Sequence, residues 1–172
     1  MPGHKHISLH CLITCVILCA AVLTMPSVTA SGLDLHWLWH DRCAACHGHS
    51  GDFARRVLDI TSGELQGRHH VHDLRTFLHN HYLSGREVDA IYNMLLAQVK
   101  TQARFQNECS GCHGSAAVFV RESLILRDGV LYCRNRDTTV HHFLDNHGDL
   151  SQGDVGFYTD VLTRIAHEVY RP

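Results

Sequence analysis

The residues with the clearest capacity for chemistry lie in "CAACHG" at positions 43–48. Cys43 and Cys46 are separated by two residues, and His47 follows the second cysteine directly. Two thiols at this spacing can form a redox-active dithiol or half of a zinc site. With the adjacent histidine they can also form a covalent attachment site for haem. The motif taken alone leaves these three chemistries open.

The motif recurs 66 residues downstream as "CSGCHG" at positions 109–114. At that offset, without gaps, 14 of the 39 positions from Cys43 to His81 are identical in the two halves. The identities continue outside the motif, where "FLHNH" at 77–81 matches "FLDNH" at 143–147. The chain is therefore a tandem duplication whose repeating unit is long enough to be a small domain.

The duplication separates shared histidines from incidental ones. Only two histidine pairs are kept across the offset, namely His47 with His113 and His81 with His147. The histidines of "GRHHVHD" at 67–73 have no histidine counterparts in the second half. Each half therefore offers the same set, a C-x-x-C-H motif followed by one further histidine.

The spacing C-x-x-C-H is typical of c-type haem attachment, because two thiols bond to the haem and the adjacent histidine ligates its iron from the proximal side. A dithiol of the thioredoxin kind needs a surrounding βαβ pattern, which is not visible, and a zinc site does not explain a histidine after both cysteine pairs. We expect two haem c groups as cofactors. The predicted attachment residues are Cys43, Cys46, Cys109 and Cys112, and the predicted proximal iron ligands are His47 and His113.

The distal iron ligands are predicted from what the two halves share. Met94 is the only methionine after residue 30, and it lies in an amphipathic helical pattern without a methionine counterpart, so we expect it in the core. His81 and His147 are the predicted distal ligands, which would make both irons bis-histidine. The alternative is that these two histidines form hydrogen bonds near the haem edge.

Three further residues remain candidates. Arg68 and Arg134 match across the offset, and they either contact haem propionates or lie in solvated loops. Cys133 aligns with Gly67 and is therefore outside the shared set. It is a buried inert thiol, an axial ligand, a reactive thiol or one half of an intermolecular disulfide.

Residues 1–30 have the order of a secretory signal peptide. Lys5 precedes an apolar run at 11–25, and "PSVTA" then places small residues before a cut after Ala30. The apolar run is shorter than the roughly 20 residues that span a bilayer, so we expect export to the periplasm without a transmembrane anchor. The remaining chain has 14 basic and 17 acidic residues and no basic stripe, which argues against a nucleic-acid partner.

Helical periodicity frames both motifs. We expect one helix over 33–42 and capped helices starting at Ser84 and Ser151, with loops between each motif and its distal histidine. The expected fold is all-α, with a first domain over 31–99 and a second domain over 100–172.

This arrangement of "CAACH" and "CSGCH" between helices resembles the class I cytochrome c domain, here in tandem as a dihaem cytochrome c. The resemblance implies haem attachment at the four motif cysteines and proximal ligation by both motif histidines. It departs on the distal side, where the family's usual methionine is missing. The function we expect is periplasmic electron transfer between redox proteins, without enzymatic activity of its own.

Two alternatives remain open at this stage. The chain is a haem enzyme or gas-binding sensor if one axial position is open or labile, with the cluster at 67–73 lining a distal pocket. It is an electron-transfer subunit of an oxidoreductase if it has a permanent partner.

Overall fold

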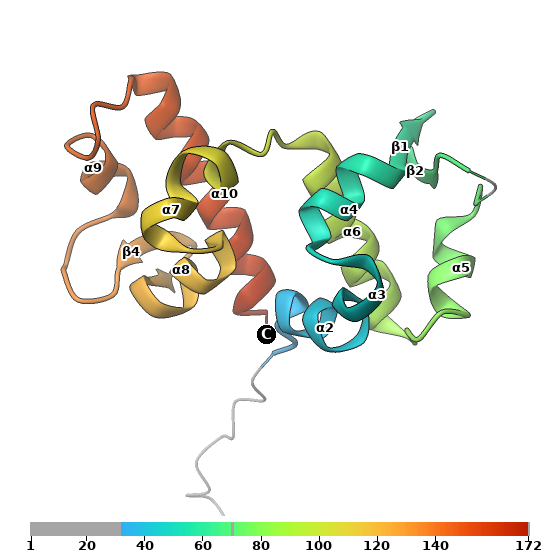
Figure 1. Ribbon diagram of the computed structural model, residues 1–172. Helices are drawn as coiled ribbons and strands as arrows, with labels where there is room; N and C mark the ends of the chain where they lie inside the picture. Colours follow the sequence, from blue (N-terminus) through green and yellow to red (C-terminus); the bar gives the residue numbers. More distant parts are fainter. Residues whose placement is uncertain (1–31, 70, 172) are drawn as a thin grey trace, which may run out of the picture. The chain divides into compact units, whose positions relative to one another are not determined.

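The computed structural model describes residues 32–69 and 71–171, and the chain from residue 31 onward forms one compact unit. The predicted signal peptide at 1–30 lies outside the described residues. The two halves have closely similar orders of elements (Figure 1). The elements of the first half are α2 (Leu35–Arg42), α3 (Ala44–His47), α4 (Ser50–Val57), β1 (Leu58–Thr61), β2 (Glu64–Gly67), α5 (Leu74–His79) and α6 (Arg86–Lys100). Those of the second half are η1 (Phe105–Cys109), α7 (Ser110–His113), α8 (Ala116–Ser123), β3 (Leu124–Arg127), β4 (Val130–Cys133), α9 (Val140–Leu144) and α10 (Gln152–Val169).

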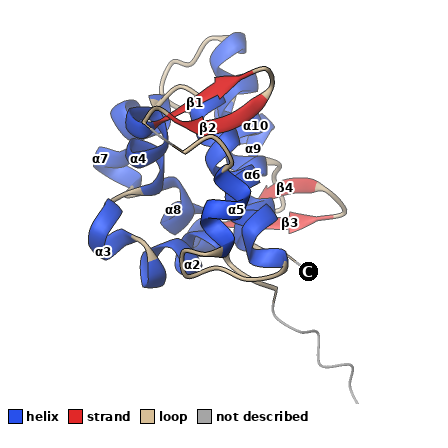
Figure 2. Cartoon of the chain, turned by 90° about the vertical axis from the view of Figure 1, so that its right-hand side faces the viewer, coloured by secondary structure: helices blue, strands red, loops and turns tan. Residues whose placement is uncertain are grey.

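The prediction of an all-α fold is wrong, because each half contains an antiparallel β-hairpin (Figure 2). Strand β1 pairs with β2, and β3 pairs with β4. The turn residues Ser62, Gly63, Asp128 and Gly129 all have positive φ, between 47° and 85°. Two consecutive residues with positive φ are typical of the type I′ turn, whose twist matches that of the strands it joins. The fold is therefore a mixture of helices and two small sheets.

The helices begin largely where the sequence predicts. The side chain of Asp34 caps α2 by accepting hydrogen bonds from the N–H groups of His36 and Trp37, which confirms the helix expected over 33–42. Ser151 and Asp154 form a complete capping box at α10. The cap expected at Ser84 is wrong, because the N-cap of α6 is Gly85 and no side chain caps the helix; the backbone N–H of Ser84 does donate to Glu87 at 3.1 Å.

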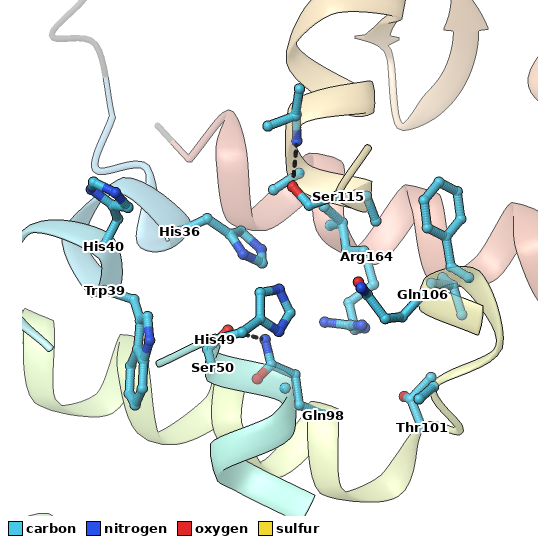
Figure 3. Close-up of a pocket in the computed structure, with 18 of the residues that line it drawn as sticks. His36, Trp39, His40, His49, Ser50, Gln98, Thr101, Gln106, Ser115 and Arg164 are labelled. Carbon is cyan, nitrogen blue, oxygen red and sulfur yellow. Dashed lines mark hydrogen bonds between the residues drawn. The ribbon is translucent and has the colours of Figure 1, made fainter. Parts of the chain in front are cut away.

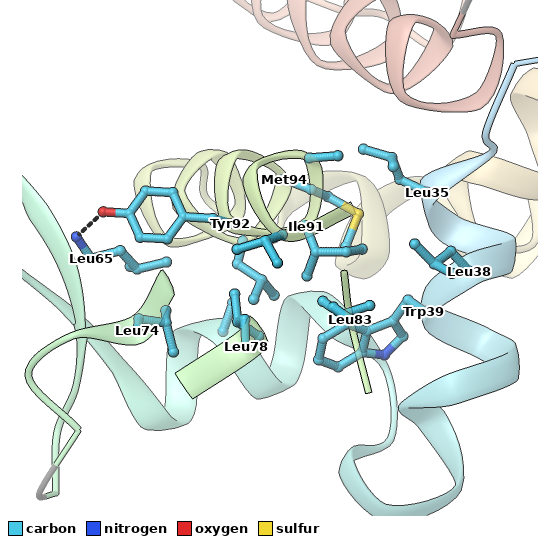
Figure 4. Close-up of a cluster of buried hydrophobic side chains, with 14 of the residues drawn as sticks. Leu35, Leu38, Trp39, Leu65, Leu74, Leu78, Leu83, Ile91, Tyr92 and Met94 are labelled. Atoms are coloured by element: carbon cyan, nitrogen blue, oxygen red, sulfur yellow. Dashed lines mark hydrogen bonds between the residues drawn. The ribbon is translucent and has the colours of Figure 1, made fainter. Parts of the chain in front are cut away.

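The apolar side chains gather in two clusters, one for each half. The first draws its buried residues from positions 35–95 and the second from positions 105–169. Met94 is 1% exposed in the first cluster, among Leu35, Leu83 and Ile91 (Figure 4). Its predicted place in the core is thus confirmed. The domain boundary between residues 99 and 100 stays a prediction. It lies between the two ranges of sequence from which the clusters draw their buried residues.

Polar contacts join the two halves beside a cavity (Figure 3). On one side, the His36 Nε2 and Glu168 Oε2 atoms of α2 and α10 are 2.8 Å apart. Close by, the Arg121 guanidinium donates two hydrogen bonds to Asp34, at 2.7 and 3.0 Å. These pairs connect the first helix of one repeat to helices α8 and α10 of the other.

Within the described ranges, no helix is long and apolar enough to cross a membrane.

Tyr92 connects the β1–β2 hairpin to α6 and generates a prediction about stability. Its hydroxyl accepts from the Leu65 N–H at 2.8 Å and donates to Glu64 at 2.6 Å, and Tyr92 is 2% exposed. We expect Tyr92→Phe to lower the free energy of unfolding by about 1 to 3 kcal/mol, because a buried N–H loses its acceptor. Urea unfolding of the purified protein measures this loss.

The matched control is Tyr82→Phe, since Tyr82 is 75% exposed. Equal stability of the Tyr92 and Tyr82 variants would contradict a structural role for the Tyr92 hydroxyl.

Candidate functional site

The two histidines that each half shares lie close together. The ring centroids of His47 and His81 are 6.0 Å apart, and those of His113 and His147 are also 6.0 Å apart. An imidazole nitrogen binds a first-row metal ion at about 2 Å, and the ring centroid lies roughly 1 Å behind that nitrogen. Two imidazoles that ligate one metal from opposite sides therefore have centroids about 6 Å apart. Both pairs have the separation that such ligation requires.

A single helical turn presents each motif. In α3 the His47 N–H donates to the Cys43 carbonyl at 2.9 Å, so the cysteine and the histidine lie one turn apart. Gly48 and Gly114 then follow with φ of 68° and 65°, a conformation that glycine adopts without the steric cost of a side chain. The chain changes direction directly after each histidine.

His81 and His147, the predicted distal ligands, lie just beyond α5 and α9. The N–H of His81 donates to Leu78 at 3.1 Å, and that of His147 donates to Leu144 at the same distance. A phenylalanine four residues earlier stacks on each ring, with centroids 4.8 Å apart for Phe77 and 5.0 Å for Phe143. The end of a short helix therefore orients each distal ring.

Aromatic contacts orient the motif histidines as well. The centroids of Phe53 and His47 are 4.7 Å apart, and those of Phe119 and His113 are 4.5 Å apart. In the first half the indole N–H of Trp39 also donates to the Gly48 carbonyl at 2.8 Å. Phe53 and Phe119 thus pack against the predicted proximal ligands.

A cavity of about 580 Å³ surrounds the histidine pair of the second half. Its lining brings together Cys109, Cys112, His113 and His147, which sequence analysis selected independently. The remaining lining residues are mainly apolar and aromatic, among them Phe105, Phe119, Leu124, Val140, Phe143, Leu144, Leu150 and Leu162. A mostly apolar cavity of this size, with few polar groups, is typical of a site for an organic cofactor.

The protonation of these groups argues against a redox dithiol. Burial raises the pKa of the Cys43 and Cys109 thiols, although the neighbouring Arg42 opposes the rise at Cys43. A catalytic dithiol instead needs a cysteine whose pKa is lowered. Burial and the nearby His81 lower the pKa of His47, which favours the neutral imidazole that binds metals.

The number of protein ligands distinguishes a haem site from a structural zinc site. In the part of the chain that the structure describes, no three side chains of His, Cys, Asp or Glu converge as a metal-binding group. Structural zinc needs four such ligands, whereas haem iron takes four of its ligands from the porphyrin and two from the protein. Two imidazoles with centroids 6.0 Å apart, together with two thiols, fit the protein groups that haem c takes.

The matched arginines bind backbone carbonyls. Arg68 donates to the Arg55 carbonyl at 3.0 Å, and Arg134 donates to the Arg121 carbonyl at 2.8 Å. These equivalent contacts attach each hairpin to the preceding helix. A propionate contact for either arginine stays a prediction. In the cavity of the second half, Arg136 rather than Arg134 is a lining residue.

Two further side chains at this site are Cys133, which has no cysteine counterpart in the first half, and Tyr158, which matches Tyr92 at the offset of 66. Cys133 lines the cavity of the second half, and burial raises the pKa of its thiol. Tyr158 also lines this cavity and donates a hydrogen bond to Glu108, and burial raises the pKa of its hydroxyl. Sequence periodicity indicates only that Tyr158 is apolar core, because its partner lies 50 residues away.

The histidine cluster of the first half is only partly described. His69 and His72 are exposed to solvent, and His70 lies outside the described residues.

Comparison with family models, curated proteins and solved structures gives no match for this chain.

The contacts of Arg134 generate a prediction that separates its two candidate roles. Its guanidinium donates to the carbonyls of Arg121 and Leu124 and to the Tyr170 hydroxyl at 2.7 to 2.9 Å. We expect Arg134→Gln to lower the free energy of unfolding by about 1 kcal/mol, because the side chain is exposed and water partly replaces these bonds. Chemical unfolding followed by circular dichroism measures the change.

Arg56→Gln is the control, since Arg56 is an exposed arginine of α4 that lines neither cavity. Unchanged stability together with a shifted haem reduction potential in the Arg134 variant would instead indicate a propionate contact.

Proposed function

We propose that this protein is an exported dihaem c-type cytochrome that carries electrons between redox proteins. The observation that supports the proposal best is the repeated pair of imidazoles at 6.0 Å, each pair beginning with the histidine of a C-x-x-C-H motif. When bound, haem supplies one-electron exchange at its iron. The protein residues determine how that iron is held and what reaches it.

The cysteines would anchor each cofactor through Cys43 and Cys46 in one half and Cys109 and Cys112 in the other. The two paired histidines of each half would ligate its iron, which would exclude an exogenous ligand. The close packing of Phe53 and Phe119 on the motif histidines restricts movement of those rings. Rigid ligands favour fast electron transfer, because little rearrangement accompanies a change of oxidation state.

The proposed location is the periplasm, which agrees with the signal-like residues 1–30 and with covalent haem attachment. The proposed partners are a protein donor and a protein acceptor of electrons. Residues 31–172 have a small excess of acidic residues and no basic stripe, so we propose no nucleic-acid partner.

The first test counts haems and open iron sites. We expect two haems per chain by the pyridine haemochrome method, and no spectral change when carbon monoxide is added to the dithionite-reduced protein. The physical reason is that His81 and His147 occupy the positions that carbon monoxide would take. Rapid carbon monoxide binding at one haem would favour a gas sensor or enzyme over a carrier.

The second test removes one distal histidine. We expect His81→Ala to keep both covalent haems and to let carbon monoxide bind about one equivalent per chain, because one axial position becomes available. The control is His79→Ala, an exposed histidine at the end of the same short helix. A His81 variant that still excludes carbon monoxide would show that another residue is the distal ligand of the first haem.

A further inference from the structure

The residue directly after the distal histidine differs between the two halves. Tyr82 follows His81, whereas Gly148 holds the matching position after His147. Both residues have positive φ, 67° for Tyr82 and 71° for Gly148. Glycine adopts this conformation without steric cost, but a residue with a bulky side chain does so only against its local preference. The conformation of Tyr82 therefore depends on the contacts that its side chain and backbone make with the rest of the first half.

The Tyr82 ring contacts the predicted distal ligand of the first half. It lies edge-on to the His81 imidazole, with centroids 4.9 Å apart and an interplanar angle of 66°. Phe77 stacks on the same imidazole at 4.8 Å. In the second half Phe143 stacks on His147 at 5.0 Å, and Gly148 has no ring to add a further contact. His81 therefore has one aromatic neighbour more than its counterpart.

A hydrogen bond from Arg42 holds the Tyr82 backbone. The Nη1 atom of Arg42 donates to the Tyr82 carbonyl at 3.2 Å. Arg42 directly precedes Cys43, so this bond joins the segment of the distal histidine to the segment of the C-x-x-C-H motif. The matching residue of the second half is Glu108, whose carboxylate accepts hydrogen bonds from Arg104 and from Tyr158. An ionised carboxylate has no donor for a carbonyl, so this position cannot form the same link in the second half.

The second half is open at the position that Tyr82 takes in the first. Gly148 lines the cavity of about 580 Å³ together with His147. A Cβ atom added at Gly148 would have no heavy atom within 4 Å. The segment that carries His147 therefore has both fewer contacts and more space beside it.

We propose that Tyr82 and Arg42 hold His81 in place, and that His147 is the distal histidine that a small added haem ligand, such as cyanide, displaces more readily. Tyr82 is thus a positioning residue that acts through His81. The inference rests on the proposed dihaem function and goes beyond it, because it makes the two iron sites unequal. A histidine must dissociate before an added ligand can take its position, so the inequality is a difference in rate.

The test measures how fast cyanide displaces each distal histidine. Excess cyanide is added to the oxidised, full-length holoprotein, and the haem absorption spectrum is followed with time. We expect two phases of one haem each, because the two histidines are held differently. We expect Tyr82→Gly to speed the slower phase about threefold to tenfold and to leave the faster phase unchanged, since one edge-to-face aromatic contact is lost. Tyr82→Phe keeps the ring and should keep both wild-type rates.

The reverse exchange, Gly148→Tyr, is the matched variant, because the structure leaves space for a side chain there. We expect it to slow the faster phase. A single rate for both haems of the wild type, or wild-type rates in Tyr82→Gly, would overturn the proposal. If cyanide displaces neither histidine of the wild type, Tyr82→Gly must still make one haem reactive, and its failure to do so would also overturn it. Fewer than two haems per chain, counted before cyanide is added, would instead contradict the proposed function.

Discussion

Each half holds two imidazoles with ring centroids 6.0 Å apart, and the other elements of the half position these two rings. The two rings come from segments 34 residues apart in sequence, so no local geometry holds them together. A helical turn with a C-terminal glycine presents one ring, and a short helix with a stacked phenylalanine presents the other. A β-hairpin lies between the two segments in sequence, and Arg68 or Arg134 attaches it to the preceding helix. The hairpin reverses the chain, so that the second ring can approach the first. Because the same devices occur twice, the pairing is a property of the repeat.

The small size of each repeat affects how the two halves are held together. A repeat of about 66 residues buries little apolar surface by itself, and each half has its own modest cluster of buried side chains. The halves are joined by polar pairs, His36 with Glu168 and Arg121 with Asp34. Buried and half-buried polar pairs of this kind favour one relative arrangement more than they add stability. The cavity between the halves lies beside these pairs, and His36 and Arg121 are among its lining residues.

The hairpins show where sequence reasoning failed and why. Asp128 and Gly129 stand between "LILR" and "VLYC", a pattern that predicts a two-residue hairpin. This hairpin is missed when glycine and polar residues are interpreted only as loop formers. The matching Ser62 and Gly63 are a weaker signal, yet they adopt the same positive φ. The helices were predictable because capping residues and apolar periodicity act within a few residues of chain.

The sequence by itself determined which groups are repeated: two C-x-x-C-H motifs, two further histidines, matched arginines and capped helices. These follow from spacing along the chain, and the backbone converts such spacing directly into local geometry. Only the tertiary structure decided that His47 meets His81, that Arg68 and Arg134 bind carbonyls, and that Gln98 is buried with an unpaired oxygen. Each of these depends on packing between segments distant in sequence. That packing is the sum of many weak contacts, so no short motif encodes it.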